Sequence, residues 1–276
     1  MDRVAAYPAR MMGHPQIAEL WRTYGRHAEA MLSAGPDPRV FRTSESFLAL
    51  SGAPYVDLNQ AAIFGDGDEA TAQALIDHVA DADVPCLLGI SSTVHDDLAG
   101  VLLDAGFEAM PERESLFHAP TMPPPAPTAF QVRRVRSEDD QAGVRQILGE
   151  AHGYAADLVE QVHGPRLLDR PDVGCWIAWD RDEPVSCVFV TRVARSLGVF
   201  DMMTPPHHRR RGAARAVLTA ALTDAAGWGE PADAVTFWAT PAGRPLYESM
   251  GFRIVDEIDV WTLGATPEEL AAVGIG

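Results

Sequence analysis

Four arginines surround a glycine in one short stretch of the second half of the chain. After Pro205 and Pro206, the stretch reads Arg209-Arg210-Arg211-Gly212-Ala213-Ala214-Arg215 and leads into an Ala-rich helical run. The first backbone N–H groups of a helix have no partners within it and lie at the positive end of its dipole. Small residues let a ligand approach this backbone closely. The stretch predicts a pyrophosphate site, although taken alone it fits a solvated helix start equally well.

The charge of the chain excludes several kinds of partner. The 276 residues include 39 Asp and Glu against 22 basic residues, a net charge of −17, and all 22 basic residues are Arg. Nucleic-acid backbones require a basic surface, and an anionic membrane would repel an acidic one. Without Lys, a Schiff-base mechanism is excluded within this chain. Since 15 of the 22 Arg follow residue 128, the basic turn is a focused anion site for a small polyphosphate.

A proline-rich segment divides the chain in two. Its length corresponds to about two domains of roughly 100–150 residues each. Five prolines fall within residues 119–128, and such a segment neither pairs in a sheet nor continues a helix. We therefore predict a first domain over residues 1–119, a linker over 120–128 and a second domain over 129–276.

The hydrophobic spacing predicts an α/β fold with a mixed sheet. In the first half we expect helices at 15–33, 68–80 and 94–105 and strands at 47–50, 55–64, 85–90 and 113–118. In the second half we expect helices at 138–151, 155–163, 210–227 and 245–250 and strands at 130–135, 175–179, 185–193, 197–204, 235–239 and 253–262. A hairpin turn at 180–184 argues against a purely parallel sheet.

A weak internal repeat relates the two halves. Residues 101–107 read Val-Leu-Leu-Asp-Ala-Gly-Phe, and residues 246–252 read Leu-Tyr-Glu-Ser-Met-Gly-Phe. Each stretch follows a strand and a loop and precedes a terminal strand. The repeat predicts two related domains, of which only the second carries the basic turn.

On these motifs, the chain resembles the GNAT superfamily of N-acetyltransferases. The family pattern Arg/Gln-x-x-Gly-x-Gly/Ala is matched by residues 209–214, and its Leu-Tyr-x-x-x-Gly-Phe is matched by residues 246–252. The resemblance covers about residues 130–263. It implies two GNAT-like acyl-CoA N-acyltransferase domains in tandem, the first a degenerate copy. The chain departs from the family at Thr240 and Gly243, where Asn and Ala are common.

The resemblance implies acetyl-CoA, or a related acyl-CoA, as co-substrate. The pyrophosphate would lie on the amides of residues 210–215, and the pantetheine arm would pair with residues 202–204, where a backbone N–H would polarise the thioester carbonyl. The predicted cofactor-binding residues are Met202, Met203, Thr204, Arg209, Arg210, Arg211, Gly212, Ala213, Ala214, Arg215 and Thr240.

The catalytic roles are expected from the same resemblance. Tyr247 would protonate the leaving thiolate, and a phenol pKa near about 10 suits a thiol pKa of about 8.5; the alternative is a core tyrosine. Asp201 is the candidate base, although it could face solvent or cap a loop, and a water chain could replace it. Glu150 and His152 would line the acceptor pocket. Trp176 could add an aromatic wall, although core packing is the commoner role of Trp.

The resemblance thus implies an N-acetyltransferase that transfers the acetyl group directly to a small-molecule or protein amine. A non-catalytic acyl-CoA-binding sensor and a structural dimerisation protein are the alternatives. No metal site is expected, because the nine His lack HxxxH and HxH spacing. Cys86, Cys175 and Cys187 are predicted to be buried thiols. Without a signal-like start or a long apolar run, we expect a cytoplasmic monomer or homodimer with no nucleic-acid or membrane partner.

Overall fold

The computed structural model describes residues 12–120, 128–266 and 269. Most of the predicted linker, residues 121–127, lies outside this described part. None of the helices in the described residues is long and apolar enough to cross a membrane.

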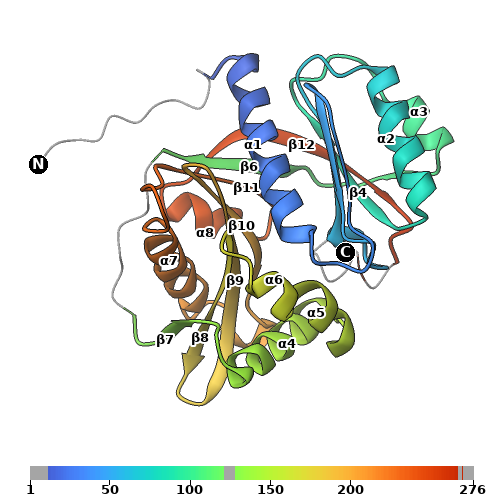
Figure 1. The fold of residues 1–276 in the computed structure, drawn as a ribbon. Coiled ribbons are helices and arrows are strands. Elements are labelled where there is room, and N and C mark those ends of the chain that lie inside the picture. Colours follow the sequence, from blue (N-terminus) through green and yellow to red (C-terminus); the bar gives the residue numbers. More distant parts are fainter. Residues whose placement is uncertain (1–11, 121–127, 267–268, 270–276) are drawn as a thin grey trace, which may run out of the picture.

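The helices and strands follow one another along the whole chain (Figure 1). The helices are α1 (His14–Leu32), α2 (Glu69–Ala82), α3 (Ala99–Asp104), α4 (Glu138–His152), α5 (Ala156–His163), α6 (Pro165–Leu168), α7 (Ala213–Ala225) and α8 (Arg244–Ser249), with 3-10 turns η2 (Val56–Leu58) and η3 (Pro206–His208). The strands are β1 (Arg39–Arg42), β2 (Ser46–Leu50), β3 (Asn59–Ile63), β4 (Cys86–Ser91), β5 (Glu108–Ala109), β6 (Glu114–Ala119), β7 (Gln131–Arg134), β8 (Val173–Asp180), β9 (Glu183–Val193), β10 (Ser196–Met203), β11 (Ala234–Ala239) and β12 (Arg253–Leu263).

Within the described residues, the strands form one 12-stranded sheet. Its order is β1-β2-β3-β4-β12-β6-β11-β10-β9-β8-β7, and β5 pairs with β12 outside this path. The β3–β4 and β10–β11 pairs are parallel, whereas neighbours such as β9 and β10 are antiparallel. This mixed sheet confirms the predicted fold class.

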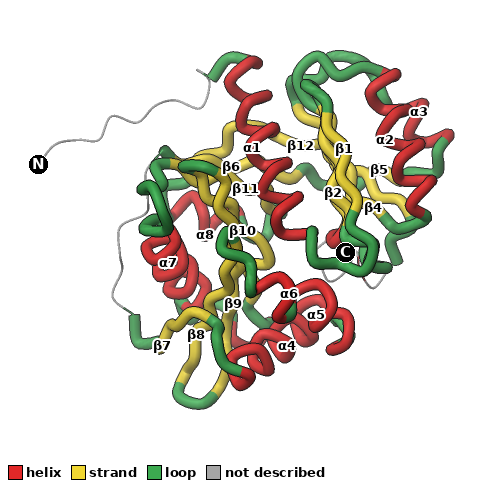
Figure 2. The backbone as a smooth tube through the Cα atoms, viewed as in Figure 1, coloured by secondary structure: helices red, strands yellow, loops and turns green. Residues whose placement is uncertain are grey.

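The last strand of each half pairs within the other half of the sheet. β6, from the first half, lies between β11 and β12 and pairs with β11 through Phe117 and Phe237. β12, from the second half, pairs with β4 through Trp261 and Leu88. Figure 2 shows these strands at the junction, where the sheet runs on from one half to the other. The boundaries 1–119 and 129–276 stay a prediction, because the two halves share this sheet.

Helices cover both faces of the sheet. On one face, called here the α1 face, α1, α4 and α5 pack on a core that includes Trp21, Ile147 and Phe200. On the opposite face, the α7 face, α7 and α8 cover a core that includes Val217 and Phe237, and α2 and α3 cover the core of the first half. In Figure 1, α1 runs across the middle of the molecule, beside the junction of the halves.

Two predicted helices are shorter than expected, for local reasons. The helix expected over 210–227 begins only at Ala213, because Arg210 and Gly212 have φ angles of 66° and 90°, and a right-handed helix cannot include them. The helix expected over 94–105 covers only α3, whose first amide bonds to the Asp97 carboxylate at 3.1 Å. The start of the strand expected over 55–64 forms η2 instead.

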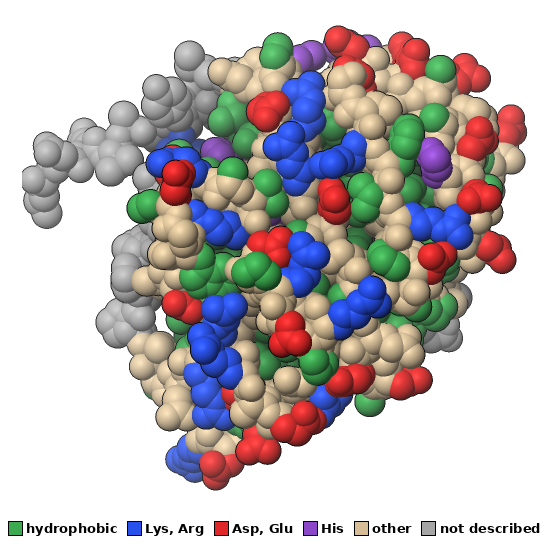
Figure 3. All heavy atoms as spheres, viewed as in Figure 1, with side chains coloured by type: hydrophobic (Ala, Val, Ile, Leu, Met, Phe, Trp, Pro, Cys, Tyr) green, Lys and Arg blue, Asp and Glu red, His purple; other side chains and the backbone are tan. Residues whose placement is uncertain are grey.

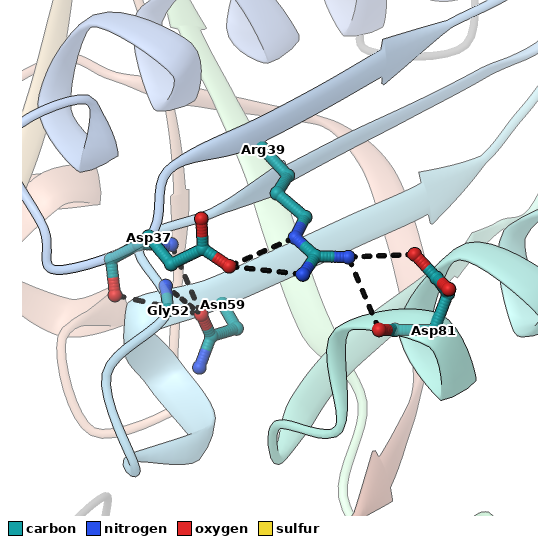
Figure 4. Close-up of polar contacts among 6 residues, drawn as sticks. Asp37, Arg39, Gly52, Asn59 and Asp81 are labelled. Carbon is teal, nitrogen blue, oxygen red and sulfur yellow. Dashed lines mark hydrogen bonds and ion pairs between the residues drawn. The ribbon is translucent and has the colours of Figure 1, made fainter.

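Polar contacts hold the edge of the first half (Figure 4). Arg39 of β1 donates to Asp37 Oδ2 at 3.0 Å and to Asp81 Oδ2, near the end of α2, at 2.8 Å. Asn59 Oδ1 accepts from the backbone N–H of Gly52 at 3.1 Å. Exposed ion pairs contribute little free energy each, so these contacts mainly orient β1 and its neighbouring loop.

Candidate functional site

The predicted pyrophosphate turn lies between β10 and α7. Arg210 and Gly212 both have left-handed backbone angles, and Gly212 is the N-cap of α7 with no side-chain cap. A Cβ on Gly212 would meet nothing within 4 Å. Glycine is therefore favoured here by the positive φ angle, and not because a side chain would clash. The first amides of α7 are therefore left uncapped, as an anion site requires.

A cavity of about 400 Å³ lies beside this turn. Ligand pockets are typically about 300–1,000 Å³. The lining residues are Thr128, Ala129, Phe130, Asp180, Arg211, Gly212, Arg215 and Ala216. In Figure 3, acidic side chains gather along the α2 and α3 side of the visible face, while arginines are more frequent over its centre and its second-half side. The cavity thus offers cationic side chains and helix amides to an anion within an acidic protein.

The arginines of the turn have different partners. Arg209 Nε donates to the Thr204 carbonyl at 3.1 Å and braces the turn. Arg211 forms an ion pair with Asp180 at the cavity, and Arg215 donates to Ser249 Oγ at 2.5 Å. Arg210 is exposed and has no side-chain partner within the described part of the chain, so its guanidinium is free to meet an anion.

The strands β10 and β11 separate soon after they begin. In the described chain their parallel pairing consists of Ser196 with Ala234 and Leu197 with Val235. On its other side, β10 is irregular between Phe200 and Met203, where its register to β9 shifts. Backbone N–H and C=O groups of β10 are therefore left outside the ladders and can bind an extended ligand.

A β-bulge fixes the side chains at this opening. Asp201 has a φ of 44°, an unusual angle for a residue other than Gly. Met202 packs on the α7 face, whereas Met203 and Phe200 pack on the α1 face. Asp201 also belongs to the α1 face, because its Oδ2 lies 2.8 Å from His163 Nε2 at the end of α5. The bulge thus presents one carboxylate to the α1 face.

Tyr247 lies on the α7 face within an aromatic cluster. It is 6% exposed, and its ring lies 4.6 Å from Phe237 and 5.4 Å from Phe117 between centroids. Burial raises the pKa of Tyr247 above its ordinary value. A Cβ on Gly243 would approach the Tyr247 ring to 2.6 Å, so a larger residue at this position would displace the ring. The phenol is therefore held in its protonated form.

Buried polar groups collect on the α1 face around the bulge. The Tyr154 hydroxyl donates to Asp57 Oδ2, and His152 Nδ1 lies 3.6 Å from the same oxygen. Burial raises the pKa of Asp57, although His152 and Tyr154 oppose the rise. Burial also acts to raise the pKa of Asp201, but the neighbouring His163 outweighs it, so this pKa lies below its ordinary value. Asp201 is therefore an ionised carboxylate next to the opened strands.

Residues 171–254 match the model of the acetyltransferase (GNAT) domain family. This part of the second half is therefore similar to a GNAT acetyltransferase domain. The matched region runs from the start of β8 to β12 and includes the basic turn, the bulge and Tyr247. A search of curated proteins finds no match.

Solved structures share the fold over most of the chain. A GCN5-related N-acetyltransferase from Kribbella flavida has a TM-score of 0.62 at 17% identity and covers 93% of this chain and 97% of its own. A functionally unknown conserved protein from Staphylococcus epidermidis has a TM-score of 0.59 at 12% identity, with coverages of 83% and 95%. A tandem GNAT protein from the clavulanic acid biosynthesis pathway has a TM-score of 0.53 at 11% identity, with coverages of 96% and 91%. The GNAT fold is therefore confirmed, whereas a degenerate first copy stays a prediction.

The structure brings some of the predicted site residues together and separates others. His152 and Asp201 lie in the same buried polar region, on the α1 face. Glu150 lies 3.7 Å from His207, which precedes the basic turn. Trp176 lies on the α7 face, stacked on Trp228 at 5.3 Å, and so it does not join His152. Thr240 follows β11, and its carbonyl accepts from the Gly243 amide at 3.1 Å.

Sequence reasoning missed Glu114, the first residue of β6. This glutamate is 5% exposed, and burial raises its pKa to about 7, with the Asp57 carboxylate adding to the rise and Trp238 opposing it. The sequence did contain a signal, because Glu114 is a charged residue at the start of a predicted strand whose central residues are apolar. The pairing of β6 with β11 could not be predicted from local spacing, so nothing in the sequence connected Glu114 with the candidate site.

One group of possible metal ligands lies beside the turn. Within the described residues, ligand atoms of Glu183, His207 and His208 lie within 4.8 Å of one another. Arg211 donates to His208 Nδ1 at 3.2 Å, so the other nitrogen of this ring carries the hydrogen and faces Glu183 at 3.2 Å. Hydrogen bonds thus account for this group without an ion. The three predicted buried thiols are confirmed as free and buried cysteines.

Proposed function

We propose that this protein is an N-acyltransferase that transfers the acetyl group of acetyl-CoA to an amine by direct attack. The observation that carries the proposal is the alignment of two features along β10. Its opened edge and bulge suit an extended pantetheine arm, and the strand leads directly to the uncapped start of α7 and its cavity. The pyrophosphate would lie on the amides of residues 212–215, with Arg210 free to add its charge.

The bulge and Tyr247 supply the remaining chemistry of the proposed reaction. A backbone N–H of Met202 or Met203 polarises the thioester carbonyl as it gains negative charge. Tyr247, whose phenol is kept protonated by burial, donates a proton to the leaving thiolate. The amine approaches from the α1 face, where the Asp201 carboxylate lies.

The acceptor is proposed to be a cationic amine. A net charge of −17 attracts cations to the protein as a whole, and ionised Asp201 adds a local negative charge at the bulge. A small-molecule amine and the amine of a protein side chain both fit this description. We propose no nucleic-acid partner, since the surface lacks a general basic excess.

Calorimetry and a thiol-release assay test the proposal. Acetyl-CoA should bind with a dissociation constant within about 1 μM to 1 mM, the usual range for enzyme substrates. A panel of primary amines should contain at least one that releases CoA thiol faster than water does. Binding without release from any amine would favour the sensor alternative, and no binding at millimolar acetyl-CoA would overturn both.

A further inference from the structure

Three carboxyl groups from the two halves of the chain meet on the α1 face. Asp57 lies in η2, Asp201 in the bulge and Glu114 at the start of β6. Leu116 packs in the α1-face core, and Glu114 shares its side of the strand because it lies two residues away. Asp57 raises the pKa of Glu114, and Asp201 raises that of Asp57. The three groups are thus near enough to repel one another.

Two of these carboxyl groups are held by neighbouring side chains. Asp57 Oδ2 is held by Tyr154, and Asp201 Oδ2 is held by His163. Glu114 faces the indole N–H of Trp238, which lowers its pKa but forms no full hydrogen bond. Burying carboxylates close to one another is costly because like charges repel. A bound cation with N–H groups would offset this repulsion.

A buried imidazole beside the carboxyl groups has one ring nitrogen without a partner in the described chain. The side chain of His152 is 7% exposed, and its Nδ1 faces Asp57 at 3.6 Å. Its Nε2 is buried and makes no hydrogen bond within the described residues. This unsatisfied nitrogen is a second sign, independent of the carboxylates, that the region is built to meet a polar ligand.

Aromatic rings complete the surroundings. Tyr24 of α1 stacks on Phe200 at 5.7 Å and meets the edge of Trp238 at 6.1 Å. Burial, Glu114 and Asp201 all raise the pKa of Tyr24, so its phenol lies near both carboxyl groups. Carboxylates beside aromatic faces are the surroundings that bind an alkylammonium ion.

We propose that these groups form an acceptor site built by both halves, which binds a primary alkylamine as its ammonium ion and in which Glu114 is the base. The inference rests on the proposed function. Asp57 and Asp201 hold the ammonium, and Glu114 takes one of its protons. The neutral nitrogen then forms the C–N bond to the thioester carbon as the C–S bond breaks. A second proton passes from the nitrogen to solvent, Tyr247 gives its proton to the thiolate and regains one from solvent, and Glu114 releases its proton to solvent.

Glu114 is suited to this step by its surroundings. A base acts best when its pKa lies near the working pH, and burial brings the pKa of Glu114 to about 7. The titratable groups that face it from the neighbouring elements are Tyr24 of α1, Asp57 of η2 and, beyond Tyr24, Asp201 of β10. The positive charge of the bound ammonium would offset the negative charges of the two aspartates. This stabilises the ionised form of Glu114.

The test compares Glu114→Gln with Glu112→Gln, an exposed glutamate two residues away. With acetyl-CoA and a panel of butylamine, 1,4-diaminobutane and 2-phenylethylamine, Glu114→Gln should lower kcat about 10²-fold or more, whereas Glu112→Gln should match the wild type. Acetyl-CoA binding measured by calorimetry should be equal in all three proteins. The wild-type rate should rise with pH through about 7, and the Glu114→Gln variant should lack this step.

A readout without turnover separates this inference from the proposed function. In infrared spectra, a carboxylic acid band present in the wild type at pH 6 should be absent from Glu114→Gln and should diminish when butylamine is added. Full kcat and an unchanged pH profile in Glu114→Gln would overturn the role of Glu114 while leaving the acetyltransferase proposal intact. Acetyl-CoA binding without binding of any panel amine would overturn the acceptor site, and loss of acetyl-CoA binding in the wild type would overturn both.

Discussion

Glu114 imposes a cost on the folded protein that depends on pH. Burial raises its folded pKa to about 7 from an ordinary 4.5. The folded state therefore holds the proton more tightly than the unfolded state, so the stabilisation is full below pH 4.5 and is lost as pH rises through 7. At about 1.4 kcal/mol per pKa unit, the loss is on the order of 3 kcal/mol. Urea unfolding of Glu114→Gln at pH 4.5 to 8 should lack this loss, and Glu112→Gln should retain it. Equal pH dependence in wild type and Glu114→Gln would contradict the burial argument.

Substitutions at Tyr247 and Gly243 distinguish a catalytic role of the Tyr247 hydroxyl from a packing role of its ring. Its hydroxyl makes no hydrogen bond in the described chain, while its ring packs against Phe237 and over Gly243. Tyr247→Phe should therefore leave the urea midpoint nearly unchanged and slow thiol release about 10²-fold. Gly243→Ala should instead displace the ring and lower both stability and rate. Unchanged turnover in Tyr247→Phe would remove this residue from the mechanism.

At the scale of elements, the turn before α7 allows a matched test of anion binding. Gly212 and Gly229 both have positive φ, and a Cβ on either would meet nothing within 4 Å. Alanine at either position should cost about 1 kcal/mol or slightly more in unfolding free energy, because only the backbone angle is strained. Calorimetry should show weaker acetyl-CoA binding in Gly212→Ala alone. Equal affinities in the two variants would mean that the pyrophosphate does not lie on this turn.

The helix α1 is fixed to the second half by a buried histidine. His27 Nδ1 lies 2.8 Å from Thr191 Oγ1, and its Nε2 lies 3.2 Å from Ser196 Oγ. Burial lowers the pKa of His27 to about 3, so the folded state excludes a proton that the unfolded state binds below about 6.5. Stability contributed by neutral His27 is thus present above pH 6.5 and is lost as pH falls toward 3.

Acid unfolding of His27→Gln measures this effect. The variant should be less stable at pH 7, because it loses fitted contacts, but its stability should fall less between pH 6.5 and 4 than that of the wild type. The difference is expected to be a few kcal/mol, at about 1.4 kcal/mol per pKa unit. His78→Gln, at an exposed position, serves as the control. Parallel curves for His27→Gln and the wild type would show that the pKa of His27 is the same in the folded and unfolded states.

The sequence predicted the elements whose signals are local. The Arg209–Arg215 stretch indicated its turn because glycine and small residues specify backbone angles directly, and the strand spacing correctly indicated a mixed sheet. Pairing between distant segments has no such signal. β6 and β12 were predicted as strands, but their placement in the opposite halves depends on contacts over more than a hundred residues, such as Phe117 with Phe237. For the same reason Asp57, Glu114 and His163 could not be joined to Asp201 before the fold was known.

At the scale of the whole molecule, the two halves depend on each other chemically. The first half supplies Asp57 and Glu114 to the polar region around the bulge, and its helix α1 covers the same face with Trp21 and Tyr24. The second half supplies the turn and Tyr247. A role for the first half as a mere appendage is therefore inconsistent with the structure, since removing it would open the α1 face of the second half to water.

This dependence predicts how the protein behaves when its linker is cut. A protease site placed within residues 120–128 would separate the chain into two pieces without touching a described strand. The pieces should still elute together at the size of the intact 29.8 kDa chain and unfold in one transition, because parting them would break the β6–β11, β6–β12 and β4–β12 pairings and expose the Phe117 and Phe237 rings to water. The uncut protein is the control, and cut protein in urea should give two separate pieces. Elution of two folded pieces in native buffer would mean that each half closes its own sheet in solution and would contradict the exchange of terminal strands.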